Sequence, residues 1–550
     1  MLTLGDRPAG RWAVLARWVF SLRWVRWAAW GAAALLGVAL LIGTAWVLSN
    51  WNDIEPVPRP PELVLPTPKV SDERNAFFTL MGLSAPAGQD PAVAGRVEWA
   101  ARMASAARAR PAAVVAGAGA SAPASTSASA LALATAPAAA SAATTGAPDR
   151  AAAAQLLASP TGAPLMCGPP NDDCTAAWIA QAQALAAQRE KYASWGQRCD
   201  QLAAAEMAFE ERLPAFLSAA DPIAPHVTPA INCSRWLLSG AVLAWAQGRS
   251  DDAVARLTQA ARFNRSMALG SHSLIAQMVV LRAERWTLQT ITALATRDAG
   301  MATALLPLAT LALPDQAATA QRWMAVEAAF QRGMFDELAA QCPHPATSPV
   351  SDDAGPWNWL MEGASNWLMC HRIGWHPHRI QAATDTGWLH IHSALRAGVL
   401  PALRQLGDEN RQQLEQQARG FSFGPVPLSW RNTFGEVLLT ISRPAYDSYL
   451  PRHADLELHH EAAALAVAAQ AAQVPAASRA AWLANQRLSD DARARLSFSA
   501  DGLTLAARTW AEDRAAGEKI NQRDAIRIRW PGAPDAPAAS KTPITPITPK

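Results

Sequence analysis

Residues 28–48 read AAWGAAALLGVALLIGTAWVL, and this uncharged stretch decides how the chain is organised. It is close to the ~20 apolar residues that an α-helix needs to cross about 30 Å of hydrocarbon. Tryptophans, whose amphipathic rings settle at lipid interfaces, flank it at both ends. They are Trp24, Trp27, Trp30, Trp46 and Trp51. The sequence therefore predicts a transmembrane helix over residues 27–49 and makes the membrane the first expected partner.

The charges on the two sides of this stretch predict its orientation. Five arginines and a single acid, Asp6, occur in the first 26 residues, whereas Asp53 and Glu55 follow the apolar run. Positive flanks stay in the cytosol, so we expect a bacterial inner-membrane protein with a cytosolic N-terminus and a periplasmic main body. The alternative is a cleaved signal peptide, whose apolar run is about 7–15 residues and ends at a small-x-small site. Residues 46–51, WVLSNW, lack such a site, which favours an uncleaved anchor.

The overall charge excludes a nucleic-acid partner. The formal net charge is +3, but without the first 26 residues the chain has 43 basic and 44 acidic side chains. Nucleic-acid binding needs a basic face on the folded part of a protein. The basic excess is therefore a signal for orientation in the membrane.

The composition along the chain predicts a mainly α-helical protein with a small C-terminal antiparallel β-hairpin or sheet. Leu496-Ser497-Phe498 and Leu503-Thr504-Leu505 alternate around an Asp-Gly turn, a strong hairpin pattern, and residues 526–530 alternate again. The expected segments are a basic N-terminus (1–26), the transmembrane helix (27–49), a proline-rich stalk (50–70), a short helical segment (71–105), an Ala/Ser/Thr-rich disordered insert (106–154), a helical domain (155–490), a β element (491–530) and a disordered tail (531–550).

The helical domain contains one segment typical of a helical hairpin. Gly248 stands at a turn, and Ala253, Leu257 and Ala260 follow it. This pattern resembles the second half of a tetratricopeptide repeat, in which small alanines let two helices approach closely. No second copy occurs at a 34-residue offset, and a stable solenoid needs about three repeats, so an ordinary helical hairpin is the favoured interpretation. Among the other helices, we expect one over residues 198–217 and one over residues 379–397.

A histidine-rich region provides the one candidate metal site. The candidate ligands are His376, His378, His390 and His392, with Cys370, His371 and Asp385 nearby. An H-x-H pair places both rings on one face of a strand, but on a helix the two rings diverge by about 200°. Because residues 379–397 are predicted to be helical, histidines at the surface or edge of the core are the favoured interpretation.

Tryptophans crowd the same region and offer a second hypothesis. They are Trp357, Trp359, Trp367, Trp375 and Trp388. Such a cluster could stack on glycans, although large aromatic residues at near-helical spacing usually belong to the core. We find no nucleophile, phosphate-loop or metalloprotease motif. The sequence thus indicates no catalytic residue and no cofactor, and leaves enzymatic activity open.

All six cysteines follow the apolar stretch, which is consistent with an oxidising compartment. Six cysteines allow 15 pairings. Cys167 and Cys174 enclose Gly-Pro-Pro-Asn-Asp-Asp, which favours a turn, and they are the favoured disulfide. The pairing of Cys199, Cys233, Cys342 and Cys370 stays open. A zinc site is disfavoured because no C-x-x-C occurs.

Three passages together resemble a loose group of proteobacterial envelope proteins that have a single membrane anchor and no established activity. The passages are residues 75–86 (NAFFTLMGLSAP) with 88–91 (GQDP), the loop 167–174, and residues 432–449 (NTFGEVLL to PAYDSY). The resemblance extends to Asp455-Leu456-Glu457 and the terminal hairpin. It implies a helical architecture and an envelope location, and no catalytic residue.

From these observations we expect an interaction or scaffold protein of the cell envelope, with an envelope protein as its partner. The alternatives are an enzyme or metal-binding protein that uses residues 371–392, and a module that binds glycans or the cell wall.

Peptide mapping under non-reducing conditions tests the predicted disulfide. We expect Cys167 joined to Cys174 in protein isolated from its native membrane, because the intervening turn brings the two thiols together. Two free thiols at these positions would contradict both the pairing and the oxidising compartment.

Overall fold

The computed structural model describes ten stretches of the chain, which fall into two compact units. The described stretches are 10–49, 53–86, 88–109, 174–205, 208–214, 217, 224–340, 376–419, 449–510 and 526–533. One unit comprises Met1–Val57, Leu338–Ala383 and Gln417–Ile441, and the other comprises Pro58–Glu337, Thr384–Gln416 and Ser442–Lys550. The predicted insert at 106–154, apart from the end of one helix, lies outside the described residues.

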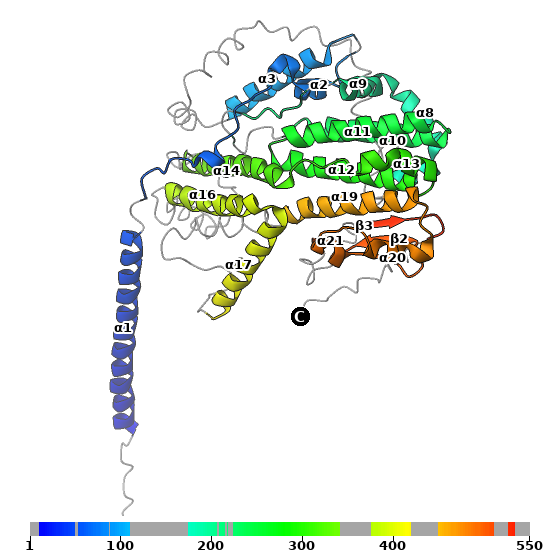
Figure 1. The fold of residues 1–550 in the computed structure, drawn as a ribbon. Helices are drawn as coiled ribbons and strands as arrows, with labels where there is room; N and C mark the ends of the chain where they lie inside the picture. The colour runs from blue at the N-terminus through cyan, green and yellow to red at the C-terminus, as the bar shows by residue number, and fades with distance from the viewer. Residues whose placement is uncertain are drawn as a thin grey trace, which may run out of the picture. The chain divides into compact units, whose positions relative to one another are not determined.

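The first unit contains α1 (Gly10–Ser49), a helix of 40 residues (Figure 1). Its segment Val25–Ala45 is long and apolar enough to cross a membrane, and none of it is buried against the rest of the protein. Leu35 and Leu41 are more than 70% exposed. An apolar helix with every side open to its surroundings is typical of a segment whose solvent is lipid.

The second unit begins with the proline-rich segment and two helices that pack together. The short 3₁₀ helix η1 (Pro61–Leu63) buries Leu63 completely. The later part of the predicted stalk is therefore docked on this unit instead of standing free. After η2 (Asp72–Arg74), Asn75 accepts a hydrogen bond from the Phe77 amide and caps α2 (Ala76–Met81), which packs on α3 (Pro91–Ala109).

Three short helices follow, and the last of them begins the region where the sequence predicts one longer helix over residues 198–217. They are α7 (Cys174–Ala180), α8 (Ala182–Lys191) and α9 (Ala193–Ala204). The expected helix over residues 198–217 ends at Ala204, and residues 209–212 form no regular secondary structure. Pro214 lacks the amide hydrogen that a helix interior uses, and the carboxylates of Glu210 and Glu211 bind backbone amides elsewhere.

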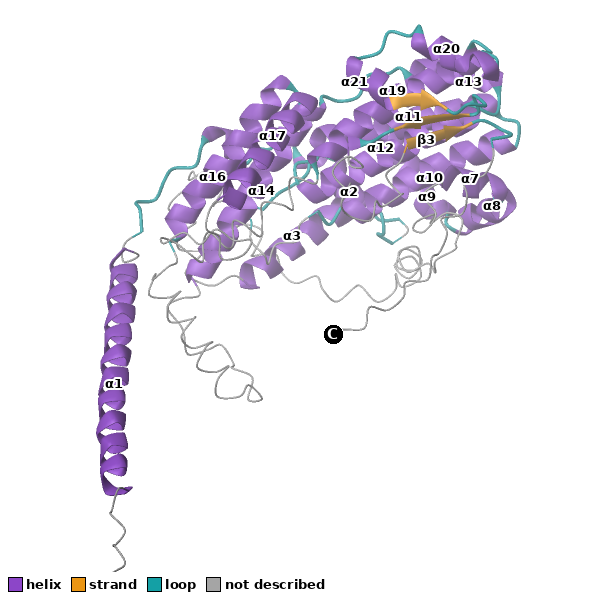
Figure 2. Ribbon diagram, turned by 90° about the horizontal axis from the view of Figure 1, so that it is seen from below, coloured by secondary structure: helices purple, strands orange, loops and turns teal. Residues whose placement is uncertain are grey.

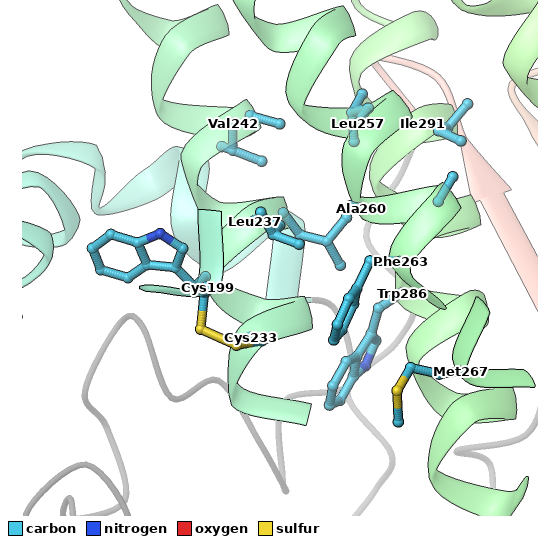
Figure 3. Packing of buried hydrophobic residues seen from close by; sticks show 14 of the residues in the cluster. Cys199, Cys233, Leu237, Val242, Leu257, Ala260, Phe263, Met267, Trp286 and Ile291 are labelled. Atoms are coloured by element: carbon cyan, nitrogen blue, oxygen red, sulfur yellow. A yellow bond between two sulfur atoms is a disulfide. The ribbon is translucent and has the colours of Figure 1, made fainter. Parts of the chain in front are cut away.

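The core of the second unit is built on α10 (Val227–Ala246), α11 (Ser250–Gly270) and α12 (Leu274–Ala295). As the hairpin pattern predicts, three residues of α11 are fully buried in the core that it shares with α10. They are Ala253, Leu257 and Ala260. Figure 3 shows Leu257 and Ala260 of α11 in one cluster with Leu237 and Val242 of α10, and the disulfide between Cys199 and Cys233. This disulfide joins α9 to α10 over 34 residues of sequence.

Further helices complete the stack. They are α13 (Ala299–Ala309), α14 (Gln316–Ala340), α16 (Pro377–Ala394), α17 (Val399–Arg419), α19 (Leu450–Ala471), α20 (Arg479–Ala484) and α21 (Asp490–Arg495), with the 3₁₀ turns η4 (Leu395–Ala397) and η5 (Ala476–Ser478). Figure 1 shows α10 and α11, then α12 and α13, then α19 in successive layers. The uncharged residues 299–314 form α13 and a turn inside this stack.

A three-stranded antiparallel sheet packs on α19, as the alternation near the C-terminus predicts (Figure 2). Its strands are β1 (Leu496–Phe498), β2 (Thr504–Ala507) and β3 (Ile526–Arg529), in the order β1-β2-β3. Leu505 pairs with Phe498 on one side and Ile528 on the other. In β3, Ile526 and Ile528 are buried while Arg527 and Arg529 are exposed, which is the period-two pattern of a half-buried strand.

The contact between Gly196 and Trp236 tests the packing of α9 on α10. A Cβ at Gly196 would lie 1.8 Å from Cζ2 of Trp236, whose ring is buried and held by a hydrogen bond from Nε1 to Asp200. We expect Gly196→Ala to lower the free energy of unfolding by about 1–3 kcal/mol through overpacking. The measurement is urea unfolding of the full chain in detergent, followed by circular dichroism.

Gly407→Ala is the matched control, because Gly407 lies in α17 with no atom near its missing Cβ. There we expect a gain of up to about 1 kcal/mol from the higher helix propensity of alanine. Equal effects of the two substitutions would contradict the close α9–α10 contact.

Candidate functional site

A pocket of about 530 Å³ opens between the end of α9 and the outer face of α11. This volume lies within the range of 300–1,000 Å³ that is typical of small-ligand sites. Its apolar lining comes from Ala76, Leu202, Ala205, Phe209, Phe263 and Met267. Its polar lining comes from Thr258, Gln259, Arg262 and Ser266.

The pocket exists because small side chains on α9 and α11 leave the space between the two helices unfilled. Three alanines, Ala203 to Ala205, end α9, and Ala255 faces them from α11. Alanine leaves the space of a larger side chain open, while Phe209 and Phe263 form aromatic walls. The result is a concave, mostly apolar surface with a few polar groups, which is the usual composition of a binding site.

The polar groups of the pocket are better suited to binding a ligand than to catalysing a reaction. The Thr258 hydroxyl donates to the carbonyl of Val254, and the Gln259 amide donates to the carbonyl of Asp200. Arg262 is exposed and forms no hydrogen bond or ion pair with the described residues. The pocket thus offers an apolar surface and one uncommitted cation to an amphipathic ligand or to a partner's side chain.

Residues 209–212 include Phe209 of the pocket wall, and hydrogen bonds fix this segment in place. The Asn75 side chain binds the backbone of Glu210 in both directions, donating to its carbonyl at 2.7 Å and accepting from its amide at 3.0 Å. The Glu210 carboxylate accepts hydrogen bonds from the amides of Lys69 and Val70. These amide bonds lower the pKa of the Glu210 carboxyl group, against the rise that burial alone would cause.

Glu211 supports the other side of the same segment. Its buried carboxylate accepts hydrogen bonds from the amides of His272 and Ser273 and from the Ser273 hydroxyl, at 2.6 to 2.7 Å. A carboxylate is favoured at the first turn of a helix, where amides are unpaired and the helix dipole is positive. Glu211 thereby fixes the start of α12 to the pocket wall.

His226 lies fully buried beside this wall, between the rings of Phe77 and Phe209. Burial lowers the pKa of its imidazole, with Glu211 opposing the shift. Neither ring nitrogen has a hydrogen-bond partner. The histidine is therefore a neutral aromatic member of the core.

A second buried acid, Glu284, stands apart from the pocket on α12. Its side chain is 2% exposed, and among the described residues neither of its oxygens has a hydrogen-bond partner. The nearest opposite charge is Arg265, whose Nε lies 3.8 Å from Oε1 of Glu284. Burial raises the pKa of Glu284 to about 7, and Arg265 limits the rise.

The structure separates the predicted metal ligands into two groups. His376 and His378 lie at the start of α16 beside Asp53, whose carboxylate accepts hydrogen bonds from the amides of His378 and Arg379. His390 lies on α16 three turns further along, and its Nε2 is 2.6 Å from Oε2 of Glu409.

His392 is half-buried near the end of the same helix, and burial lowers its pKa. Within the described residues, no three His, Cys, Asp or Glu side chains are placed to hold a metal ion. Cys370 and His371 lie outside the described residues, so the metal site stays a prediction.

The disulfide and tryptophan hypotheses are described in part. Cys174 is disulfide-bonded, but Cys167 lies outside the described residues, so their pairing stays a prediction. The structure decides the pair Cys199–Cys233, which the sequence leaves open. Of the five clustered tryptophans, Trp388 is described, and it is buried against Trp323 with its Nε1 donating to Gln331.

Comparisons with known proteins identify no relative of this chain. No protein-family model matches it, and neither a curated protein nor a solved structure does so. The resemblance to proteobacterial envelope proteins therefore stays a prediction.

The sequence contained no direct signal for the pocket, because alanine, threonine and serine are common on helices of any function. The sequence did contain one signal that residues 209–212 would not be helical. Pro214 falls inside the helix that was expected over residues 198–217, and proline disfavours a helix interior.

The buried Glu284 carboxyl predicts a pH-dependent difference in stability. With its folded pKa above the unfolded value, Glu284 holds its proton longer in the folded protein, so it costs stability as pH rises from about 4.5 to 7. We expect Glu284→Gln to raise the free energy of unfolding at pH 7.5 by up to about 3 kcal/mol relative to wild type, and to change it little at pH 4.5. Urea unfolding at the two pH values measures this difference.

Glu98→Gln is the control, since Glu98 is exposed and pairs with Arg102 on the surface of α3. Its effect should stay small at both pH values. A gain for Glu284→Gln that does not grow between pH 4.5 and 7.5 would contradict the raised pKa.

Proposed function

We propose that this protein is a binding protein of the bacterial cell envelope, anchored in the inner membrane by α1 and carrying its helical domain in the periplasm. The observation that carries the proposal is the fully exposed apolar surface of Val25–Ala45. Burying that surface in lipid is strongly favourable, whereas leaving it in water is not. A helix of this length is consistent with a single crossing.

The charges around α1 and the cysteines support the periplasmic side. The arginines that precede the apolar segment favour a cytosolic N-terminus, while Asp53 and Glu55 follow it. The disulfide Cys199–Cys233 is of a kind that persists in oxidising compartments and is rare in the cytosol. Both features favour the same orientation.

The pocket on α11 supports a role in binding. Its apolar walls, its few polar groups and the free Arg262 can recognise a partner segment or ligand, while the surrounding carboxylates are engaged with backbone amides. The domain would then act as a docking site held near the membrane, with an envelope protein as the expected partner.

A reporter fusion tests the orientation. An enzyme that folds only in an oxidising compartment, fused after Trp530, should be active, and a cytosol-dependent reporter at the same position should be inactive. The control is the same pair of reporters on a chain that lacks residues 1–49, for which the outcomes should reverse. Activity of the cytosolic reporter on the full chain would overturn the proposed location.

Photo-crosslinking in intact cells tests the binding role. A photoreactive amino acid at Thr258 or Ser266 in the pocket should give a discrete crosslinked product, whereas the same group at the exposed Thr303 on α13 should not. Equal labelling at all three positions, or none at any, would contradict a binding role for the pocket.

A further inference from the structure

Arg189 on α8 occupies an unusual position for a cation. Its guanidinium lies 3.6 Å from the ring centre of Trp236, and its Nη1 donates to the carbonyl of Trp236 and, at 2.9 Å, to the hydroxyl of Ser239. Nη2 makes no hydrogen bond with the described residues. Burial lowers the pKa of Arg189 to about 9, which shows how little solvent and counter-charge it meets.

A second arginine, Arg256 on α11, reaches the same place. A Cβ at Gly240 of α10 would lie 2.8 Å from Nη2 of Arg189 and 3.2 Å from Nη1 of Arg256. The two nitrogens are therefore at most about 6 Å apart, the sum of these distances. Gly240 makes this arrangement possible because a larger residue would occupy the meeting point.

The charge of this arginine pair is only partly balanced. Asp200 of α9 is the acid beside it, but its Oδ1 accepts from Trp236 Nε1 and lies 3.6 Å from Nη1 of Arg256, beyond a normal hydrogen bond. Two cations and one anion leave an excess of one positive charge. The side chains of Arg256 and Asp200 are 34% and 33% exposed, so solutes can reach the site.

We propose that Arg189 and Arg256 form a binding site for a carboxylate. A carboxylate is planar, accepts two hydrogen bonds side by side from guanidinium groups, and carries the single negative charge that balances the site. A phosphate dianion would leave an excess negative charge beside Asp200. This site uses Arg189 of α8 and Arg256 of α11, neither of which lines the pocket, and it does not depend on the membrane location of the protein.

The test uses the full chain in detergent with ¹³C-labelled acetate at constant ionic strength, and follows the transverse relaxation of acetate by NMR. Wild type should broaden the acetate signal, and Arg256→Gln should weaken the binding constant at least about tenfold, as expected for the loss of a charge-assisted hydrogen bond. Arg297→Gln, which removes an equal charge from an exposed side chain outside both the pocket and the arginine pair, should bind acetate like wild type.

Gly240→Ala gives a second test that changes no charge. Its methyl group would displace the Arg189 guanidinium and should also weaken binding. Arg256→Gln keeps the proposal testable if Gly240→Ala fails to fold, because Arg256 is partly exposed. The site is overturned if wild type does not broaden acetate, if Arg256→Gln binds as well as wild type, or if inorganic phosphate binds and acetate does not.

A second probe distinguishes the sources of the carboxylate. The blocked peptide N-acetyl-Ala-Asp-Ala-amide presents the same group on a polypeptide. Binding of both probes would support an acidic side chain of a protein as the ligand, and binding of acetate alone would support a small carboxylic acid.

Discussion

The helical domain depends on the short segment 209–212, whose residues form hydrogen bonds with backbone groups at three places. Asn75 pairs with the backbone of Glu210, the Glu210 carboxylate accepts the amides of Lys69 and Val70, and the Glu211 carboxylate accepts the amides that begin α12. Unpaired buried amides would each cost free energy. One segment therefore joins the proline-rich entry, α2 and α12 into a single body, and the pocket wall at Phe209 is part of it.

Arginine has a structural role throughout this chain, which contains 43 arginines and only five lysines. Among the described residues, guanidinium groups lie over four indole rings: Arg189 over Trp236, Arg235 and Arg282 over Trp286, Arg479 over Trp530, and Arg495 over Trp510. Arginine is suited to such positions because its planar, weakly hydrated group can stack and donate hydrogen bonds together. The proposed carboxylate site adds a second arginine to one of these stacks.

The pocket and the arginine pair both use α11, and the Gln259 amide links the two by donating to the carbonyl of Asp200. Residues of α11 therefore contribute both to an apolar pocket and to a cationic site that a ligand or partner could bind. The proposed membrane anchor would hold the domain near its partners at high effective concentration, so sites of modest affinity would suffice. The two proposed sites together would suit a partner that combines apolar groups with a carboxylate.

The sequence by itself determined the apolar α1, the mainly helical class, the packing of Ala253, Leu257 and Ala260, and the C-terminal sheet. Each of these follows from a local period or from the length of an apolar run, which neighbouring residues carry without help from distant ones. Only the tertiary structure decided the non-helical segment 209–212, the disulfide Cys199–Cys233, the pocket and the meeting of Arg189 with Arg256. Their partners lie tens of residues apart, and hydrogen bonds between distant groups overrode the predicted helix at residues 209–212.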